Sequence, residues 1–162
     1  MTPSVSQQIL DFIDNHHQLV LAIVDQDGPW SIPLFYVRHQ DRLGFLSSPR
    51  SRHGRLELPT QVAFSIASDH QEWKTIRGLQ GAGELIRLQG EEQQLMLSRY
   101  RQDFAFLNKP TELLARALER TRCYGIRIQH LSWTDNRYGF GKRREFNLAD
   151  DPELNALLQR AR

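Results

Sequence analysis

Alternating apolar and polar residues divide the chain into short strands with a few helices between them. Residues 1–17 carry apolar side chains at helical spacing behind Ser4 or Ser6, either of which can cap an amphipathic helix: Val5, Ile9, Phe12 and Ile13. In residues 19–48, DQDGP and RHQD separate three apolar runs. That pattern is typical of antiparallel strands joined by tight turns, and it predicts a meander.

The rest of the chain continues this alternation. A fourth strand is predicted at 61–68 and a long fifth at 72–89, where Gly78, Gly81 and Gly83 indicate bulges or sharp coiling. A helix is expected from about Glu91, with Met96, Tyr100, Phe104 and Leu107 on one face. A second, at 111–121, is expected to turn Leu113, Leu114, Ala117 and Leu118 inward. A strand at 123–136 and a tail or helix at 145–162 complete the chain.

This order predicts a mainly β (α+β) fold. About six antiparallel strands of this length favour a closed or nearly closed barrel, because closure removes exposed edges. The 162 residues are expected to form a single domain, with 40% hydrophobic residues and a net charge of +2. The apolar runs are shorter than the ~20 residues that a membrane span needs, and the N-terminus lacks a signal-peptide pattern. We therefore expect a cytoplasmic protein without membrane association.

Few residues outside the strands indicate metal or thiol chemistry. Cys123 is the only cysteine, which excludes an internal disulfide, and its alternating surroundings predict a buried, inert thiol. The six histidines show no metal-ligand spacing, so no metal site is expected.

The segment FLSSPRSRHGRL (45–56) concentrates hydroxyls and cations at a predicted helix start. Ser48 and Pro49 suit the cap and first turn of a helix, whose free amides favour anions. Phosphate is the natural ligand for such a turn. The alternative from the residues alone is a capped helix with solvated arginines.

A second candidate is WTDNRYGFGKRREF (133–146). Its rings could stack on a planar molecule, and its cations could bind an acidic substrate or a phosphate: Trp133, Tyr138, Phe140, Lys142, Arg143 and Arg144. The alternative is a turn with a solvated basic edge. Nucleic-acid binding is a third, disfavoured interpretation, because the strand order differs from that of RNA-recognition modules.

Three stretches resemble a known family: FLSSPRSRHGRLELPTQVAFSIA, IRGLQGAGELIRLQGEE and TDNRYGFGK. Together they resemble the pyridoxamine 5′-phosphate oxidase-like, FMN-binding split-barrel superfamily, and most closely its YhbP-like branch, from about Leu19 to Lys142. The resemblance implies a split barrel that binds FMN in a groove between the two subunits of a homodimer. It assigns phosphate contacts to Ser47, Ser48, Ser51, Arg52 and His53, and the strand along the flavin ring to Ser31, Ile32, Pro33 and Leu34.

The chain also departs from that family. Ser31 stands where an arginine or another polar residue is usual, and Tyr36 aligns with the lysine that meets the substrate phosphate in the true oxidases. The arginine and histidine near the C-terminus of those oxidases find no clear counterpart in GFGKRREF. We therefore expect an FMN-dependent oxidoreductase acting on a small planar molecule, and not a pyridoxamine 5′-phosphate oxidase. Tyr36, Trp133, Tyr138, Phe140 and Lys142 are the candidate substrate contacts. A deazaflavin or haem in place of FMN, and a flavin- or haem-binding protein without turnover, remain alternatives.

Overall fold

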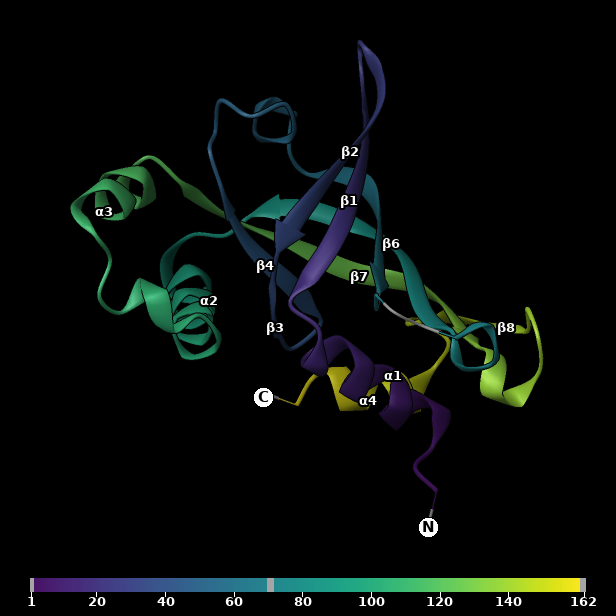
Figure 1. The fold of residues 1–162 in the computed structure, drawn as a ribbon. Coiled ribbons are helices and arrows are strands. Elements are labelled where there is room, and N and C mark those ends of the chain that lie inside the picture. The colour runs from purple at the N-terminus through teal and green to yellow at the C-terminus, as the bar shows by residue number, and fades with distance from the viewer. Residues whose placement is uncertain (1, 70–71, 161–162) are drawn as a thin grey trace.

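The computed structural model describes residues 2–69 and 72–160 and shows one curled sheet with helices around it (Figure 1). The strands are β1 (Gln18–Asp25), β2 (Gly28–Phe35), β3 (Val37–His39), β4 (Arg42–Ser47), β5 (Thr60–Ala67), β6 (Arg77–Arg87), β7 (Arg122–Asp135) and β8 (Arg143–Asn147). The α-helices are α1 (Val5–Asn15), α2 (Gly90–Asp103), α3 (Glu112–Glu119) and α4 (Pro152–Leu158). Short 3₁₀ turns are η1 (His53–Arg55), η2 (Trp73–Thr75), η3 (Ala105–Leu107) and η4 (Asn136–Tyr138).

The sheet has the order β2-β1-β5-β6-β7-β4-β3, and β8 pairs with β7. All of these pairs are antiparallel, so the predicted fold class is confirmed. β2 and β3 are consecutive in the chain but lie at opposite ends of the sheet order, with Tyr36 between them. The chain therefore crosses the split of the barrel at Tyr36.

Eight strands form where about six were predicted. The middle strand of the predicted meander breaks at Tyr36 into β2 and β3. Residues 143–147, part of which was assigned to a C-terminal tail, form β8, and α4 follows.

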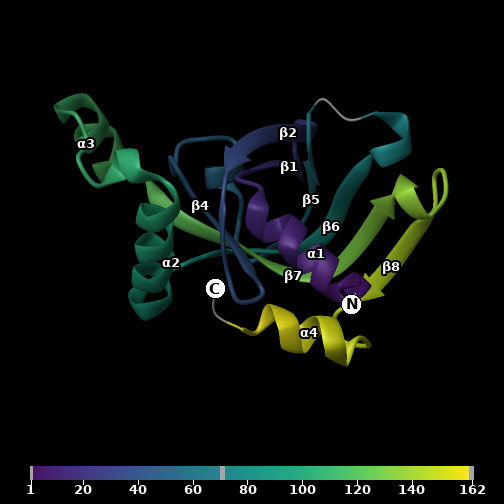
Figure 2. The same ribbon diagram turned by 60° about the horizontal axis from the view of Figure 1, so that its bottom comes forward.

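The barrel core consists of the inward side chains of the strands. Its most buried members include Leu21, Phe45, Leu85, Ile126 and Leu131. The helices α1 and α4 cover one end of the barrel (Figure 2) and contribute Ile9, Ile13, Leu154 and Leu158 to the same core. The hydroxyl of Ser4 accepts a hydrogen bond from the amide of Gln7, which confirms the predicted cap of α1.

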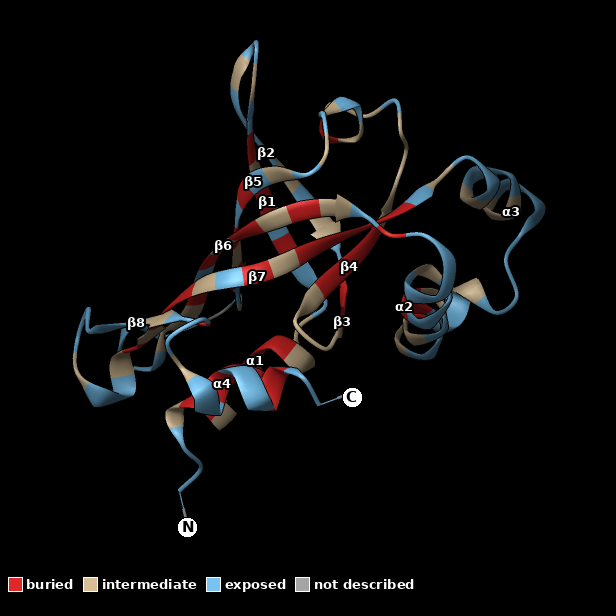
Figure 3. Ribbon diagram, turned by 180° about the vertical axis from the view of Figure 1, so that it is seen from behind, coloured by how far each residue is buried: buried red, intermediate tan, exposed pale blue. Residues whose placement is uncertain are grey.

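A smaller core outside the barrel fixes α2 to the sheet. Met96, Tyr100 and Phe104 are buried, as their spacing predicted, and pack with Val37, Leu88 and Cys123. The predicted helix forms as α3, but the expectation that it turns Leu113 and Ala117 inward was wrong. It buries none of its residues, Leu113 is 80% exposed, and Ala117 also faces solvent (Figure 3). Leu114, Ala115 and Leu118 are only half-buried, because α3 stands away from the sheet beyond α2.

The glycines of β6 serve different purposes. The register between β6 and β7 shifts at Ala82/Gly83, so the predicted irregularity is present, but the extra residue is Gln129 of β7. A Cβ atom on Gly83 would lie 2.2 Å from the carbonyl oxygen of Arg127, and one on Gly81 would lie 2.2 Å from the Phe64 ring. At Gly78 the nearest such atom is 3.8 Å away, so Gly78 makes no comparable close approach.

Candidate functional site

The basic turn, residues 47–55, follows β4. The α-helix predicted from Pro49 does not form, and a turn leads instead into η1. Ser51 organises this turn: its hydroxyl donates to the carbonyl of Ser48 at 2.6 Å and accepts from the amide of Gly54 at 3.1 Å. The hydroxyl of Ser48 accepts from the amide of Arg50 at 3.2 Å. The chain must reverse at once into β5, which leaves only a single helical turn.

Ser47, Ser51 and His53 meet inside the basic turn. The His53 Nε2 atom lies 2.6 Å from the hydroxyl of Ser47 and 3.2 Å from that of Ser51. His53 is buried, and burial lowers its pKa below the ordinary value because it disfavours the charged ring. Without a ligand the imidazolium form of His53 is therefore disfavoured, and the neutral ring is a hydrogen-bond partner of the serines.

Arg52 points away from that cluster toward the β1–β2 hairpin. Its guanidinium binds the Asp25 carboxylate at 2.6 and 2.7 Å, donates to the carbonyl of Gly28, and lies 4.8 Å from the centre of the Trp30 ring. The hydrogen bond from Arg52 lowers the pKa of Asp25 to about 2. Asp25 and Trp30 could not be predicted as partners of Arg52, because these contacts span more than twenty residues and leave no local pattern in the sequence.

A groove of about 470 Å³ crosses the outer face of β1, β2, β5 and β6 beside Trp30. Its lining is mostly small or apolar and includes Ala22, Ala63, Ala82 and Ser31. Ser31 and Pro33 are exposed on this side of β2, whereas Ile32 and Leu34 pack against the barrel core. Of the four residues predicted to lie along a flavin ring, Ser31 thus lines the groove directly.

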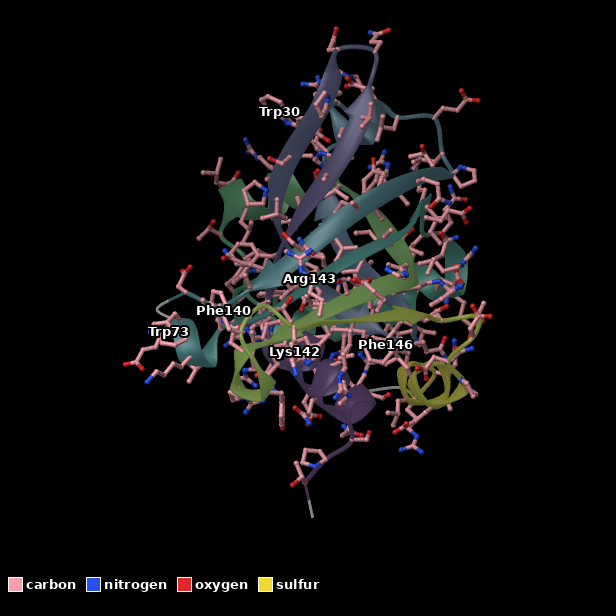
Figure 4. The ribbon with its side chains drawn as sticks, turned by 90° about the vertical axis from the view of Figure 1, so that its right-hand side faces the viewer. Trp30, Trp73, Phe140, Lys142, Arg143 and Phe146 are labelled. Atoms are coloured by element: carbon pink, nitrogen blue, oxygen red, sulfur yellow. The ribbon has the colours of Figure 1, made fainter. Side chains whose placement is uncertain are left out.

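The hairpin patch, formed by η2 and the β7–β8 connection, is the second candidate region. Phe140 is 76% exposed and meets the half-exposed Trp73 edge to face at 5.9 Å. Lys74 lies 5.3 Å from the centre of the Trp73 ring, and Lys142 and Arg143 are exposed nearby (Figure 4). Tyr138 is also exposed, under the guanidinium of Arg137. The patch thus leaves three predicted substrate contacts accessible: Tyr138, Phe140 and Lys142. Trp73 also belongs to the patch, although the sequence did not predict it as a contact.

Two predicted substrate contacts face the barrel core instead. Tyr36 is buried, and its hydroxyl donates to the carbonyl of Ile13 at 2.6 Å, so it anchors α1 to the crossing between β2 and β3. Trp133 is buried against Phe12, because the alternation along β7 turns it inward together with Leu131. Tyr36 therefore cannot meet a substrate in this arrangement, whereas Trp133 also lines a pocket of about 100 Å³ with Tyr138, Lys142 and Arg144.

The basic turn and the hairpin patch lie at opposite ends of β7. Arg122 at its start pairs with Ser47, and Asp135 at its end pairs with Arg77 beside the patch. Fourteen strand residues span up to about 43 Å. Figure 4 likewise places Trp30 apart from Trp73 and Phe140. One small molecule cannot touch both regions of the same chain.

Thiol and metal chemistry find no support in the part of the chain that the structure describes. Cys123 is buried, and burial raises its pKa to about 12, as expected for an inert thiol. Within residues 2–69 and 72–160, no three potential metal ligands cluster. Of the helices in these ranges, none combines the length and apolar character that crossing a bilayer requires.

Comparison with known proteins places the fold and the family. No protein-family model matches the chain. A UPF0306 protein from Photorhabdus laumondii is 30% identical over 140 residues, which are 85% of this chain and 92% of the relative. UPF0306 protein YhbP from Escherichia fergusonii is 28% identical over 135 residues, covering 82% of this chain and 86% of the relative.

Solved structures share the architecture at low sequence identity. A haem-binding protein from Mycobacterium smegmatis has a TM-score of 0.74 at 17% identity, over 96% of this chain and 61% of that one. The haem storage protein HutZ from Vibrio cholerae has a TM-score of 0.63 at 19% identity, over 80% and 94%. A 5-nitroimidazole resistance protein from Bacteroides thetaiotaomicron has a TM-score of 0.60 at 15% identity, over 82% and 85%. The resemblance to the YhbP-like branch and its split-barrel fold is thus confirmed, and the chain belongs to the UPF0306 family.

Proposed function

We propose that this protein binds FMN, with the phosphate at the basic turn and the flavin ring along the groove, and that it acts as an oxidoreductase on a small planar molecule. The main support for this proposal is the position of Arg52. Its backbone belongs to the basic turn, while its guanidinium lies over Trp30 at the groove. A ligand with a phosphate at one end and an aromatic ring at the other matches this arrangement.

The basic turn offers the donors that a phosphate needs. The hydroxyls of Ser47 and Ser51 and the His53 ring already form one hydrogen-bonded cluster. Gly54 lets the turn close tightly, since a Cβ there would lie 2.3 Å from the carbonyl oxygen of Ser48. A phosphate would compete with Asp25 for the Arg52 guanidinium and would favour protonation of His53.

The groove suits a flat ring. Ala22, Ala63 and Ala82 face one another across three strands and leave a shallow floor, and Trp30 stands at its side. A bound flavin supplies the electron transfer, while the protein binds the ring, orients it and restricts its access to water. Ser31 of β2 lines the groove and is the small polar residue among its mostly apolar neighbours.

Haem is the alternative that the names of two structural neighbours suggest. Haem iron is held by axial ligands such as histidine, cysteine, methionine or tyrosine. The described residues that line the groove include none of these. The groove therefore favours a flavin over a haem.

We further propose that two copies pair through the groove face, as the family resemblance implies. Val24 is 74% exposed on that face, and Val20, Trp30 and Phe35 are about half-exposed. An apolar face of this kind is typical of an interface. Pairing is also what could bring the hairpin patch of one chain to the basic turn and groove of the other, where Phe140 and Lys142 would meet a planar, acidic substrate.

The test is FMN titration of wild type and Arg52→Ala, followed by flavin fluorescence. Loss of a charge-assisted hydrogen bond predicts about tenfold to a hundredfold weaker FMN binding. Riboflavin, which lacks the phosphate, should bind both proteins alike. Arg50→Ala is the matched control, because Arg50 is exposed in the same turn.

Equal FMN affinities of wild type and Arg52→Ala would contradict the phosphate assignment. An equal loss of riboflavin and FMN binding would show that Arg52 acts through Trp30 and the groove instead. Identification of the chromophore released from protein purified from its own host then separates FMN from a deazaflavin and from haem.

A further inference from the structure

A second cavity lies outside the barrel, in the lobe formed by α2, η3 and α3. The lobe projects from one end of β7 (Figures 1 and 2). The cavity has a volume of about 330 Å³ and opens between the two helices and the ends of β4 and β7. It shares no lining residue with the groove. Leu46 faces this cavity while its neighbour Ser47 faces the basic turn, because successive side chains of a strand alternate.

The floor of the cavity is apolar. It is formed by Leu46, Leu97, Tyr100, Leu107, Leu118 and Cys123. The one strong donor among them is already satisfied, since the hydroxyl of Tyr100 donates to the carbonyl of Phe35 at 2.8 Å. The Cys123 thiol is buried and stays protonated. The floor therefore favours an apolar group.

The apolar face of α3 borders the cavity and is only partly covered by other side chains. Thr111 caps the helix, and Leu114, Ala115 and Leu118 recur at helical spacing. Short helices in proteins are stabilised mainly by burying such a face. Here the three residues are only half-buried, and Ala115 and Leu118 line the cavity. An apolar ligand would complete the contact that α3 lacks.

The rim of the cavity carries an excess of positive charge. Arg101 comes from the last turn of α2 and Arg122 from the first position of β7, against a single carboxylate at Glu119. The Arg122 guanidinium is held beside the opening by the carbonyl of Thr121 at 2.8 Å. Among the described residues, neither arginine is ion-paired with a carboxylate. Both can meet an anion at the mouth.

From this apolar floor and cationic rim we infer a binding site for a small amphipathic carboxylic acid, with its hydrocarbon body between α2 and α3 and its carboxylate at Arg101 and Arg122. The volume is near the lower end of the range for small-molecule sites, about 300 to 1,000 Å³. A medium-chain fatty acid and an aromatic acid share this chemistry. The site is independent of FMN.

Calorimetric titration with decanoate and with 2-naphthoate tests the inference, with 1-decanol as the uncharged control. We expect saturable binding of either acid. The acid that binds more tightly shows whether the cavity prefers a hydrocarbon chain or an aromatic ring. Arg101→Gln should weaken that binding about tenfold. Leu118→Trp should abolish it by filling the cavity, while Leu113→Trp, on the exposed side of the same helix, should leave it unchanged.

Three results would overturn the inference: no saturable binding of either acid, binding of 1-decanol as tight as that of decanoate, or unchanged acid binding by a folded Leu118→Trp variant. If Leu118→Trp does not fold, Arg101→Gln provides the test. Residue 101 lies on the surface, so its substitution should not disturb folding. FMN titration of the same variants is a separate readout, so failure of the cavity and failure of the flavin site are distinguishable.

Discussion

At the scale of single residues, the ion pair of Arg52 with Asp25 joins the basic turn to the β1–β2 hairpin. The pKa of Asp25 is about 2 in the folded protein, below its ordinary value near 3.9, chiefly because of the hydrogen bond from Arg52. The ionised carboxylate is thus favoured by folding. Its contribution to stability is complete above about pH 4 and is lost as the pH falls toward 2.

Asp25→Asn should therefore flatten the acid limb of the stability curve. Urea unfolding between pH 6 and pH 2.5 should show a larger loss of unfolding free energy for wild type than for Asp25→Asn. Asp27→Asn, in the same turn, serves as the control and should follow wild type. Parallel curves for wild type and Asp25→Asn would mean that the ion pair adds nothing to folding.

Residue identity alone predicted contacts well only where the partners are close in sequence. Ser47, Ser51 and His53 lie within seven positions and do meet. Arg52 was assigned to phosphate without its competitor Asp25, and Trp133 was assigned to substrate although its strand turns it inward. Such long-range pairings depend on the sheet register, which a single sequence does not specify.

At the scale of elements, the glycines of β6 allow a direct test of close backbone approach. Gly83→Ala would press a Cβ against the carbonyl oxygen of Arg127, which cannot move without disturbing the β6–β7 ladder. We expect a loss of about 1 to 3 kcal/mol in unfolding free energy, as for other overpacked sites. Gly78→Ala, with 3.8 Å of clearance, should be neutral or stabilising by up to about 1 kcal/mol.

Urea denaturation of the two variants decides between these expectations. Equal stabilities would show that the backbone at the bulge relaxes freely. Most helices and strands were predictable here because their apolar residues recur with a clear period, but the single turn after Ser48, the strand β8 and the exposure of α3 were not. Its apolar face resembles any core-facing helix, and only the placement of α2 between it and the sheet leaves that face half-covered.

At the scale of the whole molecule, the split barrel is held together by pairings between distant segments. β1 pairs with β5 and β4 with β7, so the meander expected from local turns is split between the two ends of the sheet. The chain exposes 9795 Å². A folded monomer of 18.9 kDa is expected to expose only about 8,300 Å². The projecting lobe and the apolar groove face both add exposed surface. Of these two, the groove face is the one suited to pairing with a second copy.

Ala63→Asp places a charge at the centre of that face, between Ala22 and Ala82. If two copies pair there, wild type should sediment as a dimer of 18.9 kDa chains. Ala63→Asp should sediment as a monomer, because a buried unpaired charge costs several kcal/mol at an interface. FMN affinity should fall together with dimerisation, since the groove would lose its second wall. Ala149→Asp, exposed in the turn before α4, should change neither property. A monomeric wild type that still binds FMN tightly would show that one chain holds the flavin unaided.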